Sequence, residues 1–150
     1  MGSFTDNITV KITDNKEKPY TNVEEYEFHS GRKNSGLFVR ARVDFQFNGT
    51  SIPWFLRWLI SPSDPALLQC AGIHDQLFEE GIITIRVDGL ETIVPIDRRI
   101  ANAIMAEMMK AKKVAQWKQS MVNTGLAIGS KPAWEACAET QGAVRTETTF

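Results

Sequence analysis

The residues best suited to chemistry are His74 and Asp75, which stand side by side in a stretch with helical periodicity. Imidazole titrates near neutral pH, so a histidine beside a carboxylate is a candidate general base or metal ligand. Adjacent residues on a helix point about 100° apart, however, so these two side chains do not pair directly with each other. A structural histidine, hydrogen-bonded in or near the core, therefore stays open as an equally weighted interpretation.

A metal site at the same place would draw on Cys70, which lies four residues before His74 and shares its helix face. Only His29 and Cys137 could complete a set of soft ligands with this pair. Because so few soft ligands are available, we expect neither a metal nor another cofactor.

A second candidate site is the turn Asn48-Gly49-Thr50-Ser51, which follows a predicted strand. Such a turn presents hydroxyls and backbone N–H groups to an anion or a substrate. It lacks the lysine and the glycine spacing of a phosphate-binding Walker loop. The competing interpretation is structural: Asn-Gly forms a simple turn, and Ser51 caps the segment that begins at Pro53.

The first third of the chain has the pattern of β-strands. Residues 8–13 alternate apolar and polar side chains, the period-two signature of a half-buried strand. Residues 23–28 predict an edge strand with an acidic outer face, and residues 37–45 predict a stronger strand. The face of this last strand that we expect in the core carries Leu37, Val39, Ala41, Val43 and Phe45.

The segment that carries His74 is predicted to be a helix. It begins at Asp64-Pro65, an N-cap followed by a first-turn proline, and ends at Gly81. Two β-branched runs follow in residues 82–94, and the Asp88-Gly89 between them is typical of a tight hairpin turn. A two-stranded ribbon is marginal alone, so one of its faces is expected to pack on the body or on a partner.

The rest of the chain predicts two more helices, one that begins at Asp97 and one over residues 114–128 that ends before Pro132. The order predicts an α+β fold with N-terminal antiparallel strands, three helices and an inserted β-hairpin. We expect one domain over residues 1–132, and a C-terminal tail over residues 133–150 that docks on the body or on a partner.

The composition is that of one ordinary soluble domain, with 150 residues of which 43% are hydrophobic. Its 17 basic and 18 acidic residues leave a net charge of −1, which argues against nucleic acid or an anionic membrane as the main partner. The basic run from Arg98 to Lys118 is interpreted as a solvated helix face. We expect no secretory signal and no transmembrane segment, and the two cysteines indicate a reducing compartment.

Taken in order, these segments resemble an uncharacterised family of small phage and prophage proteins, the domain-of-unknown-function family DUF1353. The resemblance covers roughly residues 37–129. It rests on a Gly-x-Ser-Ile-Pro turn after a strand, a helix with His-Asp, and a helix with an Arg-x-x-Ala entry. The residues that match are Gly49, Ser51, Ile52, Pro53, His74, Asp75, Arg98 and Ala101.

The chain departs from the family pattern where Phe47-Asn48 replaces Thr-Asp, Phe78 replaces Tyr and Asn102 replaces Asp. The family's helix pair is similar to that of phospholipase A2, where a histidine activates water, the next aspartate holds calcium and a distant aspartate orients the histidine. This likeness would give His74 and Asp75 the first two roles and position 102 the third. An amide there cannot stabilise an imidazolium, so the resemblance implies a site that keeps its hydrogen-bonding shape without the charge.

Two classes of function follow. The first is a phage-encoded structural or accessory protein, a virion component associated with the head or tail, in which a polar network fixes the fold. We expect Asn102 to lie near His74 in this network, with the turn at residues 48–51 capping the group. Its partners would be other phage proteins, and its place the virion or the host cytoplasm.

The second class is a small metal-dependent or histidine-based hydrolase acting in infection or lysis. Its candidate catalytic residues are His74, Asp75 and Ser51, and its candidate binding residues are Asn48, Gly49 and Asn102. The amides at positions 48 and 102, where the family has carboxylates, favour the first class.

Overall fold

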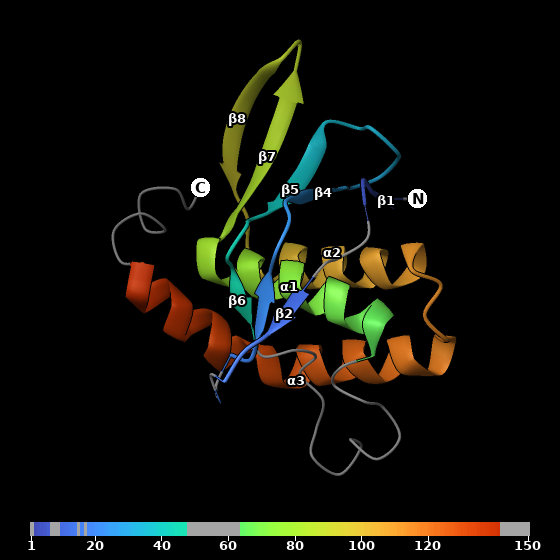
Figure 1. Ribbon diagram of the computed structural model, residues 1–150, viewed down its shortest axis with the longest axis vertical. Coiled ribbons are helices and arrows are strands. Elements are labelled where there is room, and N and C mark those ends of the chain that lie inside the picture. The colour runs from blue at the N-terminus through green and yellow to red at the C-terminus, as the bar shows by residue number, and fades with distance from the viewer. Residues whose placement is uncertain (1, 7–9, 15, 17, 48–63, 142–150) are drawn as a thin grey trace.

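The computed structural model of the protein describes residues 2–6, 10–14, 16, 18–47 and 64–141. Among these residues lie two antiparallel sheets and three helices, which confirms the α+β fold (Figure 1). The larger sheet has the order β1 (Ser3–Phe4), β4 (Tyr26–His29), β5 (Leu37–Ala41), β7 (Ile82–Val87) and β8 (Leu90–Pro95). The smaller sheet has the order β2 (Val10–Ile12), β3 (Tyr20–Asn22) and β6 (Gln46–Phe47).

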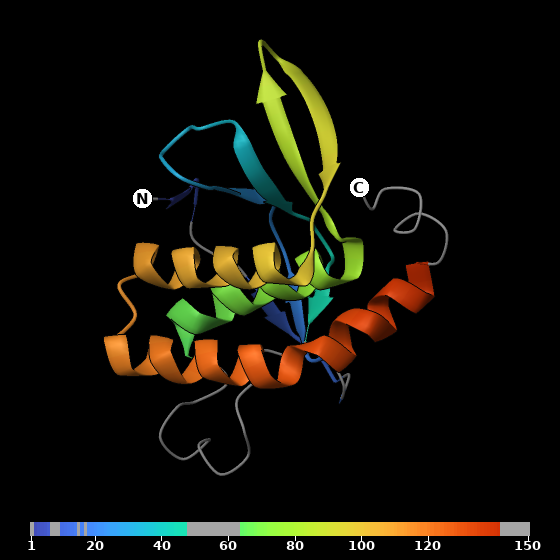
Figure 2. The same ribbon diagram turned by 180° about the vertical axis from the view of Figure 1, so that it is seen from behind.

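The helices are α1 (Pro65–Glu80), α2 (Arg98–Ala111) and α3 (Gln116–Gln141). α1 contacts β5 and β6 on one side and both other helices on the other, so it lies between the strands and the outer helices (Figures 1 and 2). Its predicted caps are confirmed: the Asp64 carboxylate accepts the N–H of Ala66 at 3.1 Å, and Gly81 ends the helix with φ 66°. None of the three helices combines the length and the apolar composition needed to cross a bilayer, among the residues described.

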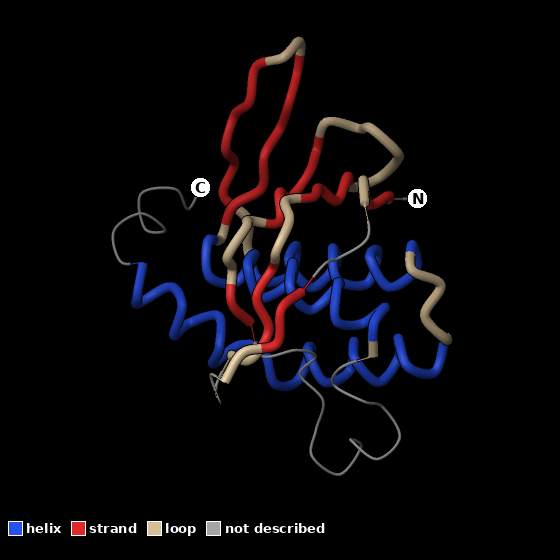
Figure 3. The backbone as a smooth tube through the Cα atoms, viewed as in Figure 1, coloured by secondary structure: helices blue, strands red, loops and turns tan. Residues whose placement is uncertain are grey.

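The predicted hairpin is confirmed as β7 and β8, joined by Asp88 and Gly89 at φ 52° and 77°. Two successive positive φ values give the turn a twist that matches the twist of the strands. Ile83, at the base of the hairpin, is buried in the main core, as one packed face requires. The ribbon then rises clear of the helices (Figure 3), and Leu90 near its tip is 76% exposed.

Two strand predictions need correction. β4 is not an edge strand, because β1 pairs with it on the side away from β5. The strand predicted over residues 37–45 ends at Ala41, where the chain turns through Asp44 at φ 64° and enters the other sheet as β6. Val43, beyond the end of the strand, is therefore exposed, and so is Leu37 at its start, whereas Val39, Ala41 and Phe45 are buried as expected.

The third helix is longer than its sequence pattern predicts. α3 continues through Pro132 to Gln141, and its ribbon changes direction along its length (Figure 2). A proline inside a helix removes one N–H and bends the axis without ending the helix. The predicted tail thus begins within a helix, while residues 142–150 lie outside the described residues, so the docking of the whole tail stays a prediction.

Candidate functional site

His74 lies on the face of α1 that packs against α2, and it is only 6% exposed. Its Nε2 is 2.9 Å from Oδ1 of Asn102 on α2. The predicted approach of Asn102 to His74 is therefore present. An amide oxygen can only accept, so the imidazole carries its proton on Nε2 and donates it to Asn102.

The hydrogen bonds continue from Asn102 into the third helix. Nδ2 of Asn102 donates to Oγ of Ser130 at 3.1 Å, and Nη1 of Arg98 donates to the same oxygen at 3.1 Å. We call these residues, His74, Asn102, Ser130 and Arg98, the three-helix polar chain. It joins α1, α2 and α3 through side chains alone.

Aromatic rings close one side of this chain. The imidazole of His74 lies 4.4 Å from the ring centroid of Phe78, one turn further along α1. Trp134 of α3 meets Phe78 edge-on, with the ring centroids 5.0 Å apart and the planes at 85°. The continuation of α3 past Pro132 is what brings Trp134 to this position, so the bent helix completes the enclosure.

Burial decides the protonation state of His74. Loss of hydration lowers its pKa to about 4, and the hydrogen bond to Asn102 offsets only part of this effect. The imidazole is therefore neutral near pH 7. A histidine with so low a pKa is a weak general base, because proton-transfer efficiency falls as the pKa drops below the working pH.

Asp75 belongs to a different environment from its neighbour. It contributes to raising the pKa of Lys18, although the main cause is the hydrogen bond from Nζ of Lys18 to Glu79, 2.7 Å long. The His-Asp dipeptide is thus split between two faces of α1, as helix geometry requires.

Cys70, proposed as a metal partner of His74, is fully enclosed in the main core. Burial raises the pKa of its thiol to about 12, and a neutral thiol is a poor ligand because metals bind the thiolate. Within the part of the chain that the structure describes, no three His, Cys, Asp or Glu side chains converge to hold a metal ion.

A second polar group, the sheet-face cluster, lies on the larger sheet and consists of Glu27, His29, Arg40, Arg86 and Glu91 around Phe38. His29 is also buried, and its Nδ1 accepts the N–H of Gly36 at 3.3 Å. Its Nε2 therefore carries the proton and donates to Oε1 of Glu27, 2.9 Å away. This histidine joins a strand to the loop that follows it.

The arginines of this cluster cover Phe38, which the sequence predicts on an outward face and which is nevertheless fully buried. The guanidinium carbons of Arg86 and Arg40 lie 4.4 Å and 5.3 Å from the ring centroid of Phe38. Hydrogen bonds from Arg40, and then from Arg86, lower the pKa of Glu91 to about 2. The charges of the cluster are largely neutralised within it.

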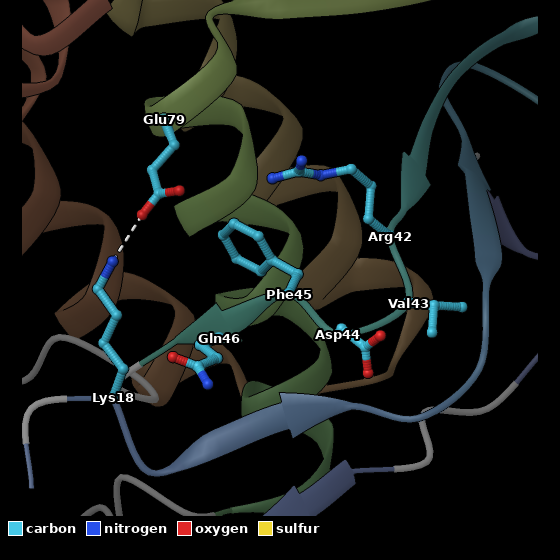
Figure 4. A pocket seen from close by; sticks show the side chains of 7 residues that line it. All are labelled: Lys18, Arg42, Val43, Asp44, Phe45, Gln46 and Glu79. Carbon is cyan, nitrogen blue, oxygen red and sulfur yellow. Dashed lines mark hydrogen bonds and ion pairs between the residues drawn. The ribbon is translucent and has the colours of Figure 1, made fainter. Parts of the chain in front are cut away.

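A surface pocket of about 290 Å³ lies between the turn after β5 and the C-terminal end of α1 (Figure 4). On one wall Lys18 bonds to Glu79, and on the other Arg42 lies over the ring of Phe45 at 5.3 Å. Arg42 also pairs with Glu80 at 2.7 Å. Both cations are thus held by carboxylates of α1, and His74 is not among the residues that line the pocket.

The remaining candidates, Asn48, Gly49 and Ser51, lie outside the described residues, so the predicted cap over the polar chain stays untested. Sequence reasoning missed Ser130 and Trp134, because the last helix was expected to end before Pro132. It also assigned the basic run at residues 98–118 to a solvated face, yet Arg98 is half-buried and bonds to Ser130, which is buried. The spacing of four between Arg98 and Asn102 was the available signal, since such residues share a helix face.

Comparison with known proteins gives one match. A family model described as "Protein of unknown function (DUF1353)" matches residues 21–125, which include His74 and Asn102 but end before Ser130. No curated protein and no solved structure matches the chain.

Proposed function

The chain belongs to the DUF1353 family of proteins of unknown function, and from this premise we propose that it is a structural or accessory protein of a phage particle. In this proposal the three-helix polar chain stabilises the fold and performs no reaction. The phage origin rests on the resemblance to small phage and prophage proteins. The partners would be other proteins of the same particle.

The observation that carries the proposal is the state of His74. Its Nε2 proton is donated to a neutral amide, its ring lies against Phe78 at an interplanar angle of 40°, and its pKa of about 4 keeps it uncharged. A hydrolase of the histidine type needs an imidazole that accepts a proton from water near neutral pH. Asp75, a second candidate catalytic residue, contributes to raising the pKa of Lys18, which lies outside the three-helix polar chain.

The polar chain is well suited to a structural role. Buried polar groups stabilise a unique arrangement when each has a partner, because an unpaired alternative is costly. Here a single linked set of side chains fixes the relative positions of three helices. A protein that must present one fixed surface to its neighbours in an assembly benefits from such a rigid interior.

The test is a mass-spectrometric inventory of purified particles from the phage or prophage that encodes the chain. We expect the protein at a constant copy number relative to the major structural proteins. A His74→Gln variant, which keeps a side-chain donor for Asn102, should enter particles at the wild-type level. His74→Ala serves as the matched variant without a donor and should enter less because it folds less completely.

A different outcome would overturn the proposed structural role. If the protein is absent from particles, and folded His74→Gln abolishes lysis or infection, the hydrolase of the second class replaces the structural protein. Circular dichroism on the purified variant separates this outcome from simple unfolding.

A further inference from the structure

β8 is an open edge of the larger sheet: within the described part of the chain, no strand lies on its outer side. The backbone N–H of Arg86 on β7 donates to Gly36 on the side of β5, so Arg86 and its partner Glu91 are not joined by ladder hydrogen bonds. Bonded and non-bonded pairs alternate along an antiparallel ladder. The backbone groups of Glu91 and Ile93 therefore point away from β7, toward the open edge.

This edge carries little of the usual protection against strand pairing. Natural edges carry lysines, prolines, bulges or inward-pointing charges, which discourage another strand from adding, and the one proline of β8, Pro95, stands at the last residue of the strand. Glu91 is the one charged residue of β8, and its carboxylate is held against the sheet face by Nη2 of Arg40 at 2.7 Å and of Arg86 at 2.8 Å. The apolar side chains of Leu90 and Ile93 are instead 76% and 63% exposed.

We propose that β8 pairs antiparallel with β8 of a second copy of this chain, about a two-fold axis at Thr92. The two larger sheets then form one continuous sheet. Glu91 of each copy lies opposite Ile93 of the other, and each such pair exchanges two backbone hydrogen bonds. Leu90 of each copy packs on Val94 of the other.

The charges and the proline of β8 favour this register over its neighbours. An axis at Glu91 would set the two carboxylates opposite each other, which is unfavourable. An axis at Ile93 would set Glu91 opposite Pro95, which has no N–H to donate, and would leave Leu90 uncovered. The register at Thr92 avoids both, because it pairs apolar residues on one face and keeps the carboxylates apart.

The first test compares Ile93→Pro with Ile93→Ala by sedimentation equilibrium. Both variants lose the same side-chain contacts, but only proline removes the N–H that points to the open edge, and the β7–β8 ladder keeps all its bonds. We expect the wild type to dimerise. The dissociation constant of Ile93→Pro should exceed that of Ile93→Ala roughly tenfold or more, since the dimer loses two hydrogen bonds.

The second test fixes the register by cross-linking. Thr92→Cys places two thiols on the axis as a non-bonded pair, close enough for a disulfide, so oxidation should give a covalent dimer. Ile93→Cys, the matched control, lies off the axis and on the other face, and should give no more covalent dimer than the wild type. Preferential cross-linking of Ile93→Cys would overturn the register.

A third comparison separates β8 from general surface stickiness. Leu90→Lys should abolish the dimer, whereas Ile128→Lys on α3, at a side chain 80% exposed, should leave it intact. A wild-type chain that stays monomeric at every concentration, or an Ile93→Pro variant that dimerises as well as Ile93→Ala, would overturn the proposal. None of these outcomes depends on the proposed phage function.

Discussion

The two histidines of the protein are both buried and both donate a proton from Nε2, yet their surroundings differ. His74 donates to a neutral amide between helices, and no charged side chain other than Arg98 belongs to its polar chain. His29 donates to the carboxylate of Glu27, which two arginines also contact on the face of a sheet. The first arrangement depends on exact hydrogen-bond pairing, whereas the second shares its charges among several partners.

This difference determines which of the two regions tolerates substitution. Removing one member of the three-helix polar chain leaves a buried partner without a hydrogen bond. The folded state is then destabilised by the full desolvation energy of that unpaired group. Removing His29 or Glu91 from the sheet-face cluster leaves Glu27 paired with both arginines on the partly exposed sheet face. Four experiments test this contrast.

The largest effect should come from acidification. The pKa of His74 is about 4 in the folded protein and near 6.5 when unfolded, so the unfolded state takes up the proton first. Its contribution to stability is complete above pH 6.5 and is lost as the pH falls toward 4, by about 3 kcal/mol in all. Urea unfolding of the wild type and of His74→Gln over this range should show the loss mainly in the wild type. If the free energy of unfolding fell equally with pH in the wild type and in His74→Gln, the loss could not come from His74.

Truncation of each histidine compares the two regions directly. His74→Ala should lower the free energy of unfolding by about 1–3 kcal/mol at pH 7, because Asn102 loses its donor in the interior. His29→Ala should cost less, about 1 kcal/mol, since Glu27 keeps both arginines and only the N–H of Gly36 loses its acceptor. Denaturant unfolding measures both. Equal losses would remove the distinction between the two regions.

Asn102→Asp should make the environment of His74 resemble that of His29. A carboxylate beside the imidazole stabilises its protonated form, so the pKa of His74 should rise by about one unit or more. NMR titration of the imidazole protons gives this value. Asn102→Ala, which offers no acceptor, should leave the pKa low. A low pKa in both variants would mean that burial alone controls the site.

The smallest effect is expected for Glu91→Gln in the sheet-face cluster. Arg40 and Arg86 keep Glu27 as a partner, so the change in melting temperature should be smaller than that of His29→Ala. Salt at about 1 M should remove most of that change, because ions screen exposed charges. A large change in melting temperature that persists in salt would show that the sheet-face cluster tolerates substitution no better than the three-helix polar chain.

The helices and the first contact of the candidate site could be predicted because their signals are local. Asp64 and Asp97 fix where α1 and α2 begin, and an expected packing of these helices brings Asn102 to His74. The hairpin could also be predicted, since Asp88-Gly89 strongly favours a tight turn in which both residues have positive φ.

The remaining features of the fold and of the site depend on pairing between distant segments, which no local sequence pattern indicates. The sheet-face cluster exists because β5 pairs with β7, although α1 separates them in the chain. Ser130 and Trp134 belong to the site because α3 continues past residue 128 and then through Pro132, where local rules predict an end. The strand after Leu37 stopped early because the turn at Asp44 carried the chain into another sheet.

The central place of α1 has a consequence for how the protein opens. Strands cover one side of this helix and α2 and α3 cover the other, and most of its residues are inaccessible to water. No partial opening of a single neighbour frees it, so the amide hydrogens around Ile73 should exchange with solvent only through global unfolding. In the monomer, where β8 lies at the rim of the sheet, the amide hydrogens of β8 should exchange through local fraying. The hydrogen-exchange free energy at the centre of α1 is thus a direct measure of the stability of the whole domain.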